Sequence, residues 1–190
     1  MKSVCRKSAG FLLAVSLSLL AGCASVSPED YASQRPSLDM LRFLAGHTTA
    51  WGLAQSRSGE VVRRFRIEMD GVAVDGDTVK VQEHDFYTDG KVEAHQWVFR
   101  RTGAHAITAT SDQVVGEARG AQYGNALNLT YTLKVQMPDG VEREFAIDDW
   151  FYLQDDCHLM NRTYASKFGF HAFDVLTFFQ KPDCAGSLPR

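Results

Sequence analysis

Residues 127–135 have the sequence LNLTYTLKV, in which apolar and polar side chains alternate without a break. Every odd-numbered residue from Leu127 to Val135 is apolar or aromatic, and every even-numbered residue is polar. A period of two predicts a β-strand with one face toward an apolar core and the other toward water. Residues 64–70, RFRIEMD, and 144–147, EFAI, follow the same pattern, so we expect several strands of this kind.

Turn-forming pairs separate these strands, and they include Asp70-Gly71, Asp75-Gly76, Asp89-Gly90 and Asp139-Gly140. Between the turns lie runs of about ten residues rich in Val, Ile, Thr and aromatic residues, which is typical of consecutive antiparallel strands. We predict an all-β fold, a closed, lipocalin-like antiparallel meander barrel of about nine or ten strands without unpaired edges. A two-sheet sandwich is the alternative, because periodicity alone does not separate the two folds. Ahead of the strands, residues 37–44 predict a short helical turn that Ser37 caps and Gly46 ends.

The N-terminal 22 residues have the three parts of a secretory signal. Three basic residues lie within the first seven, an apolar segment follows at residues 10–20, and Leu20-Ala21-Gly22-Cys23 ends it. Small residues directly before a cysteine resemble the lipobox of bacterial lipoproteins, so we predict that residues 1–22 are removed and that Cys23 is lipidated. An ordinary signal peptide or a transmembrane anchor is the alternative, but the apolar segment is only about half as long as a bilayer span requires.

We expect three parts in the chain: the lipoprotein signal peptide at residues 1–22, a lipidated N-terminus and flexible tether at residues 23–37, and a single β-barrel domain at residues 38–190. The tether prediction depends on residues 24–36, ASVSPEDYASQRP, which are rich in Ser, Pro and charge and have no apolar period. Without its signal, the chain is still long enough for one domain with a sizeable core.

The mature protein is predicted to be acidic, because the whole chain has a net charge of −3 and the charged residues of the signal are all basic. This charge argues against nucleic acid as a partner and against electrostatic binding to anionic lipid. We therefore expect the membrane to be reached through acyl chains on Cys23, which contribute about 0.8 kcal/mol per buried methylene. No Asp follows Cys23 as a retention signal, so we expect the periplasmic face of the outer membrane.

Two of the four cysteines remain for the folded domain, since Cys5 lies in the signal and Cys23 is the lipidation site. A tight connection at residues 167–171 places Cys157 and Cys184 at the open end of the last hairpin. In an oxidising periplasm we expect these two to form a disulfide, and two free thiols are the alternative. No CxxC or HExxH spacing occurs, so we expect neither a metal site nor a cofactor.

Six residues that carry polar groups fall on strand faces that the alternation assigns to the interior. They are Arg63, Glu83, His95, Trp97, Asp149 and Arg162. We treat them as candidate ligand-binding residues, in which Arg63 or Arg162 grips a carboxylate or phosphate head group. The alternative is structural: the arginines pair with Glu83 and Asp149 and fix the strand register, since an unpaired buried charge costs several kcal/mol.

Short motifs along the chain resemble a family of bacterial lipoproteins. They are Trp51-Gly52, Phe86-Tyr87-Thr88-Asp89-Gly90, Asp148-Asp149-Trp150, Leu159-Met160-Asn161-Arg162 and Lys167-Phe168-Gly169. Behind a lipobox, this order resembles the family called domain of unknown function 3833, over residues 43–181. One departure is His95-Gln96-Trp97, where the family pattern has Arg-x-Trp. The resemblance implies a single envelope domain without an established activity, and members often lie beside genes for fatty-acyl modification of lipids, which favours a role in lipid physiology.

These observations favour an outer-membrane-anchored periplasmic lipoprotein whose barrel binds or carries an acyl lipid or another apolar ligand. The alternative is a structural or interaction module of the cell envelope, with a filled core, no ligand and a protein partner that no motif identifies. An enzyme is less favoured, because Asp148 and Asp149 point to opposite faces of a strand and no G-x-S-x-G occurs. A carrier predicts an internal cavity, whereas an interaction module predicts a large exposed apolar patch.

Overall fold

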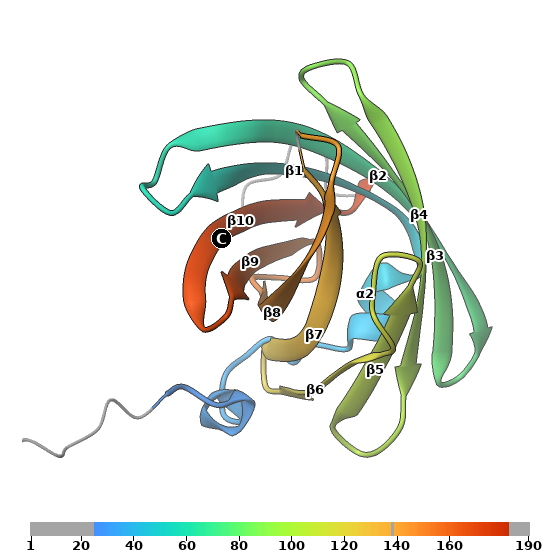
Figure 1. Ribbon diagram of the computed structural model, residues 1–190. Coiled ribbons are helices and arrows are strands. Elements are labelled where there is room, and N and C mark those ends of the chain that lie inside the picture. Colours follow the sequence, from blue (N-terminus) through green and yellow to red (C-terminus); the bar gives the residue numbers. More distant parts are fainter. Residues whose placement is uncertain (1–24, 138, 183–190) are drawn as a thin grey trace, which may run out of the picture.

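The computed structural model describes residues 25–137 and 139–182, and its ten antiparallel strands close into a barrel (Figure 1). The strands are β1 (Gly46–Ser56), β2 (Val61–Asp75), β3 (Thr78–Tyr87), β4 (Val92–Arg101), β5 (Ala106–Ser111), β6 (Ala118–Tyr123), β7 (Ala126–Gln136), β8 (Glu142–Leu153), β9 (His158–Lys167) and β10 (Phe170–Gln180). Each strand pairs with its neighbours along the chain, and β1 pairs with β10 to close the ring. The predicted meander barrel is confirmed, and the sandwich alternative is wrong.

The alternation in the sequence corresponds to the inner and outer faces of the barrel. Leu127 and Leu129 on β7 are buried, as are Ile67 and Met69 on β2. Arg64, also on β2, points to the opposite face and is exposed. A closed ring allows every strand to bury one face and solvate the other without leaving an edge. The apolar faces that periodicity predicted therefore form the inner wall.

The expected turn at Asp70-Gly71 is wrong, because β2 continues through this pair to Asp75. Gly71 instead lies where the end of the short helix α2 (Met40–Leu44) presses against the strand. A Cβ on Gly71 would come within 1.9 Å of the carbonyl oxygen of Leu44. The glycine therefore permits close packing of helix on strand rather than a change of chain direction.

Helix α2 closes one end of the barrel and lies within the ring of strands (Figure 1). Its N-cap is Asp39, whose carboxylate accepts a hydrogen bond from the Arg42 backbone N–H at 3.2 Å, so the expectation that Ser37 caps the helix is wrong. Four helix side chains are buried in the main core: Met40, Leu41, Phe43 and Leu44. We call this the plug end. The opposite end, where the β1–β2, β3–β4, β5–β6, β7–β8 and β9–β10 connections lie, is called the mouth.

The chain before the barrel is docked on it from residue 28 onward. The 3-10 helix η2 (Pro28–Tyr31) places the Tyr31 ring 5.8 Å from the ring of Trp150 and 5.5 Å from that of Tyr152. Gly124, in the β6–β7 connection, permits this approach, because a Cβ there would come within 1.7 Å of the Tyr31 carbonyl oxygen. The prediction of a flexible tether through residue 37 is therefore wrong for this segment.

Other expectations at the termini fall outside the described residues. The signal peptide and Cys23 lie outside the described residues, so cleavage and lipidation stay predictions. Cys157 lies at the open end of the β9–β10 hairpin, where its carbonyl oxygen accepts a hydrogen bond from the Lys181 N–H at 2.9 Å. Cys184 is again outside the described residues, so the disulfide also stays a prediction.

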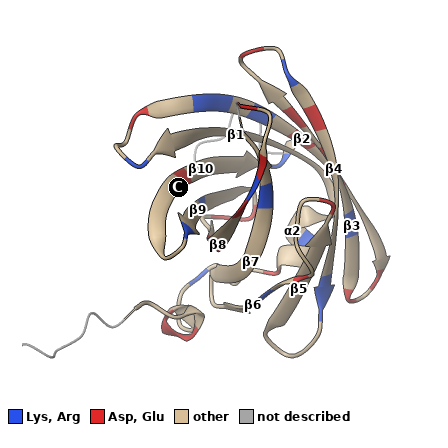
Figure 2. Ribbon diagram, viewed as in Figure 1, with Lys and Arg blue, Asp and Glu red and all other residues tan. Residues whose placement is uncertain are grey.

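The surface carries charges of both signs. Figure 2 shows acidic and basic residues interspersed over the strands and hairpins. Among residues 25–137 and 139–182, no helix has the length and apolar character needed to cross a membrane.

Candidate functional site

The inner wall of the barrel differs between its two ends. Near the plug end, inward-facing side chains such as Val79, Leu127 and Phe179 are buried against the core. Toward the mouth, inward-facing side chains stay partly exposed, and they are Phe65, Trp97, Tyr131, Leu133, Val135 and Phe173. We call these six residues the mouth wall. Water therefore reaches a mainly aromatic inner surface from the mouth.

The strand register decides where the six candidate residues point. Five lie on the inner face, and they are Arg63, Glu83, His95, Trp97 and Asp149. The sixth, Arg162, lies on the outer face: its side chain is 59% exposed and pairs with Asp174 at 3.3 Å. Met160, two residues earlier, is also exposed. The expectation that Arg162 faces the interior is wrong.

Asp149 links three strands through its buried carboxylate. It accepts hydrogen bonds from the Tyr131 hydroxyl on β7 at 2.9 Å, and from the Asn161 amide at 2.6 Å and the Thr163 hydroxyl at 2.8 Å on β9. Burial raises the pKa of Asp149, while these three hydrogen bonds act in the opposite direction. With three donors already bound, Asp149 serves the register of β7, β8 and β9.

Glu83, on β3, is a second carboxyl group of the inner face, and its environment differs from that of Asp149. Burial raises its pKa to about 8, the Asp85 carboxylate adds to the rise, and a hydrogen bond with the Trp97 side chain opposes it. A carboxyl group with this pKa is largely protonated at neutral pH. It can therefore donate a hydrogen bond to a ligand oxygen inside the barrel.

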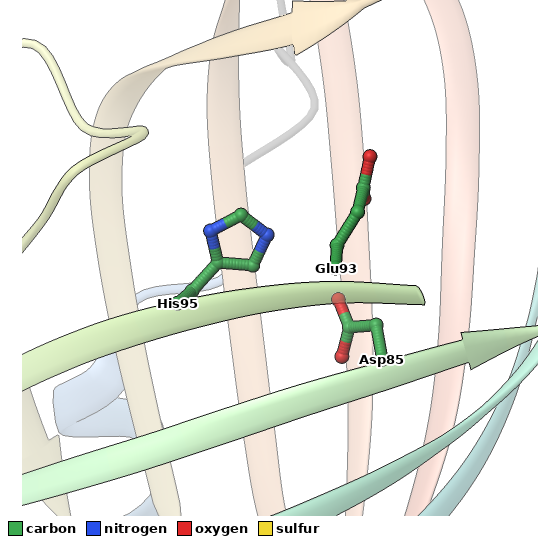
Figure 3. Close-up of side chains that lie close together, drawn as sticks. All are labelled: Asp85, Glu93 and His95. Atoms are coloured by element: carbon green, nitrogen blue, oxygen red, sulfur yellow. The ribbon is translucent and has the colours of Figure 1, made fainter. Parts of the chain in front are cut away.

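Two acidic residues that the sequence analysis did not single out, Asp85 on β3 and Glu93 on β4, lie beside His95 (Figure 3). The register pairs Asp85 with Glu93 directly across the two strands. The Tyr87 hydroxyl lies 2.8 Å from one Glu93 oxygen and 3.4 Å from one Asp85 oxygen. Burial raises the pKa of Asp85 to about 6, and the nearby His95 opposes the rise. These groups form a polar cluster on the inner wall.

The residue types in this cluster are those that bind metal ions, and one ligand atom of each of Asp85, Glu93 and His95 lies within 4.8 Å of the others. The CxxC and HExxH spacings lie within single segments, whereas this set comes from two strands. The alternation does place both acidic residues on the inner face, since Asp85 follows Glu83 by two and Glu93 precedes His95 by two. Periodicity does not give the β3–β4 register, and this register is what brings the three side chains together.

Arg63 lies at the mouth end of the inner face. Its guanidinium carbon lies 3.8 Å from the centre of the Tyr87 ring, and one guanidinium nitrogen lies 3.5 Å from the exposed Asp89 carboxylate. The structural alternative, in which the arginines neutralise Glu83 and Asp149, is therefore wrong: Arg63 pairs with Asp89 and Arg162 faces outward. A surface carboxylate is a weakly held partner, so Arg63 remains available to an anion that enters the mouth.

Exposed apolar side chains lie on the connections and strand ends around the mouth. They are Val62, Val92, Val115, Val141, Phe168 and Phe170, and we call them the apolar rim. Phe168 is 89% exposed and has a φ of 52°, in the left-handed region that bulky residues rarely adopt. An exposed apolar set of this kind is typical of a surface that contacts a ligand or a partner.

Grooves at the mouth end lie on the outer side of the barrel. One of about 540 Å³ runs over β7, β8 and β9, and another of about 370 Å³ lies mainly on the outside of β1, β2 and β3. Charged side chains line much of the first groove, whereas the second is lined mainly by aromatic side chains together with Arg64 and Arg66. The support for a ligand in the interior therefore comes from the partial exposure of the mouth wall rather than from these grooves.

Solved structures share this fold at low sequence identity. The S-type phycobiliprotein lyase CPES from Guillardia theta is 9% identical, with a TM-score of 0.52, over 77% of this chain and 93% of that chain. Rv2717c from M. tuberculosis is 14% identical, with a TM-score of 0.52, over 78% of this chain and 100% of that chain. A protein of unknown function from the DUF3598 family of Nostoc punctiforme gives a TM-score of 0.52 at 12% identity, over 78% of this chain and 51% of that chain. At these identities the likeness shows a shared barrel fold.

Sequence comparison gives the family. No curated protein matches this chain. The model of a family described as "protein of unknown function (DUF3833)" matches residues 17–181, which is most of the chain. The resemblance expected from the short motifs is thus confirmed, and the chain belongs to the DUF3833 family.

Proposed function

We propose that this protein binds an apolar ligand, such as an acyl lipid, in the mouth half of its barrel. The observation that carries the proposal is the mouth wall, whose inward-facing and mainly aromatic side chains stay partly exposed while the plug end is filled. Aromatic surface in contact with water inside a barrel is unfavourable until something apolar covers it. A ligand tail that does so gains about 25 cal/mol per Å² buried, before the costs of association.

The charges of the interior favour one orientation of an acidic ligand. Four acidic residues lie on the inner wall, at Glu83, Asp85, Glu93 and Asp149. Glu83 is largely protonated at neutral pH, but a carboxylate placed among the other three meets like charge, whereas at the mouth it meets Arg63. We infer that the head group of an acid stays beside Arg63 and that its tail lies along the mouth wall.

Replacing Arg63 by methionine tests this orientation. A guanidinium–carboxylate contact contributes selectivity for an acid over its neutral ester. We expect Arg63→Met to weaken the binding of a fluorescent fatty acid about tenfold, or about 1.4 kcal/mol, and that of its methyl ester less than about twofold. Fluorescence titration of both probes measures this.

The matched control is Arg64→Met, whose side chain is exposed on the outer face of the same strand and should leave both affinities unchanged. The melting temperature of Arg63→Met should stay close to that of the wild type, because its partner Asp89 lies at the surface. Equal losses of affinity for acid and ester would contradict the proposed orientation.

The proposal includes attachment to the periplasmic face of the outer membrane through acyl chains on Cys23. We expect the wild type to remain in the outer-membrane fraction after a high-salt wash, because buried acyl chains do not depend on charge. Cys23→Ser should release the mature domain or leave an uncleaved precursor, while Cys5→Ser, within the signal, should behave as the wild type. Mature-sized Cys23→Ser protein that still resists the wash would exclude this anchor.

A second candidate function follows from the apolar rim, which fits the interaction module of the cell envelope. In that case the rim docks on a partner and the interior takes up no ligand. The two candidates differ in one observable property, which is whether an acyl chain reaches the mouth wall.

A further inference from the structure

The polar cluster on β3 and β4 contains three side chains that converge on one region of the interior. Figure 3 shows Asp85 on β3 and Glu93 and His95 on the neighbouring strand β4. All three face inward, and one ligand atom of each lies within 4.8 Å of the others. The convergence requires the barrel register, because Asp85 pairs with Glu93 while His95 lies one inward position further along β4.

Two ligand atoms in this cluster are buried without a hydrogen-bond partner. Asp85 is only 8% exposed, and its Oδ1 oxygen has no donor within reach in the described structure. The Nε2 nitrogen of His95 is likewise buried and unpartnered. Buried polar atoms almost always find partners, so an unpaired carboxylate oxygen and an unpaired imidazole nitrogen within one cluster indicate a missing group that binds both.

The other nitrogen of His95 fixes which electron pair is free. Its Nδ1 atom lies 3.1 Å from an Asp112 carboxylate oxygen. A carboxylate accepts hydrogen bonds, so Nδ1 is the donor to Asp112, and in the neutral ring the lone pair is then on Nε2. This carboxylate–imidazole arrangement is the one that orients histidine ligands around metal ions.

Glu93 is held in place but keeps the capacity to bind an ion. One of its oxygens accepts from the Tyr87 hydroxyl at 2.8 Å, and the other pairs with the Lys91 ammonium group. Each carboxylate oxygen offers two lone pairs, so a second lone pair remains on each. Tyr87 and Lys91 therefore orient the Glu93 side chain and leave lone pairs on its oxygens for an ion.

We propose that Asp85, Glu93 and His95 bind a divalent transition-metal ion, and that Asp112 orients His95 from outside the ligand set. Zn²⁺ fits these donors best, since it accepts imidazole and carboxylates together, whereas Ca²⁺ and Mg²⁺ prefer oxygen ligands alone. Tetrahedral zinc holds its donors about 3.3 Å apart, so the three side chains close in on the ion as it binds. This inference does not depend on the proposed ligand binding.

Zinc affinity of the full chain, measured by competition with a chromophoric chelator, tests the proposal. The wild type should bind one Zn²⁺ per chain. His95→Gln and Asp85→Asn should each lower the affinity at least about 100-fold, and Asp112→Asn about tenfold, as expected for an orienting carboxylate. Bound Co²⁺ should give the visible absorption of a tetrahedral site in the wild type and lose it in His95→Gln.

The matched control is His84→Gln, on the outer face of the same strand pair, which should bind Zn²⁺ as the wild type does. Circular dichroism establishes that each variant is folded. The proposal is overturned if the folded wild type binds no Zn²⁺ at micromolar concentration, or if His95→Gln retains the affinity, which would place any zinc elsewhere. A loss in His95→Gln that Asp85→Asn does not share overturns the three-ligand assignment.

Discussion

Replacing Asp149 by alanine is expected to lower the free energy of unfolding by about 3–5 kcal/mol. The substitution removes the acceptor of three hydrogen bonds, those donated by Tyr131, Asn161 and Thr163, and Asn161 keeps only its bond to the Trp150 carbonyl oxygen. It also removes the group through which β7, β8 and β9 are joined on the inner face. Asn161 and Thr163 are buried, so water reaches the donors on β9 poorly and does not replace the carboxylate there. Urea denaturation followed by circular dichroism measures the change in the free energy of unfolding.

The neighbouring residue provides the control. Asp148 points to the outer face of the same strand, is exposed, and accepts one hydrogen bond from Asn128 at 2.5 Å. Asp148→Ala should change the free energy of unfolding by less than about 1 kcal/mol. Similar losses for the two alanine variants would show that the Asp149 network does not hold the strands as described.

Replacing Glu83 by glutamine is expected to remove a large part of the pH dependence of stability. Burial raises the pKa of Glu83 from 4.5 to about 8. Below pH 4.5 the group is protonated in both states. Between pH 4.5 and about 8 the unfolded chain releases the proton while the folded chain keeps it, so the folded state binds more protons and stability falls as pH rises.

Glutamine keeps the shape of the side chain and cannot ionise. At pH 8 we expect Glu83→Gln to be more stable than the wild type by on the order of 2–3 kcal/mol, and near pH 4 the two should be similar. Asp85, whose pKa is raised from 3.8 to about 6, contributes a loss of stability of the same sign over that narrower pH range, and the variant retains it. Urea midpoints from pH 4 to 9 measure both profiles. The exposed control Glu142→Gln should follow the wild type, and parallel profiles for Glu83→Gln would contradict this account.

The strands could be predicted from the sequence because a period of two gives each strand one apolar and one polar face, although the same pattern also fits a sandwich. Side chains such as Leu127 and Leu129 must face the core, and a barrel accommodates many such strands without an edge. The docking of η2 could not be predicted, since it depends on Gly124 admitting the Tyr31 carbonyl oxygen. Such an approach leaves no periodic signal in the segment that docks.

The error at Arg162 has a physical cause in the site itself. On β9 the inner face carries Asn161 and Thr163, because both donate to the buried Asp149. The outer face carries Met160, so the apolar residue there pointed to the wrong face. Where a polar network occupies the interior, hydropathy no longer distinguishes the two sides of a strand.

The central claim, that an acyl chain occupies the mouth half of the barrel, is tested most directly by quenching Trp97 with a brominated fatty acid. Bromine quenches tryptophan only at close contact. Trp97 belongs to the mouth wall, whereas Trp51 is exposed on the outer face and Trp150 packs against Tyr31 outside the barrel. In a Trp51→Phe, Trp150→Phe background, the account predicts saturable quenching of Trp97, and unbrominated fatty acid should displace it. The wild type, which keeps all three tryptophans, provides the comparison. Saturable quenching in the wild type that the variant with Trp97 alone lacks, or no quenching in either protein, would contradict ligand binding in the interior and leave the interaction module as the function of this barrel.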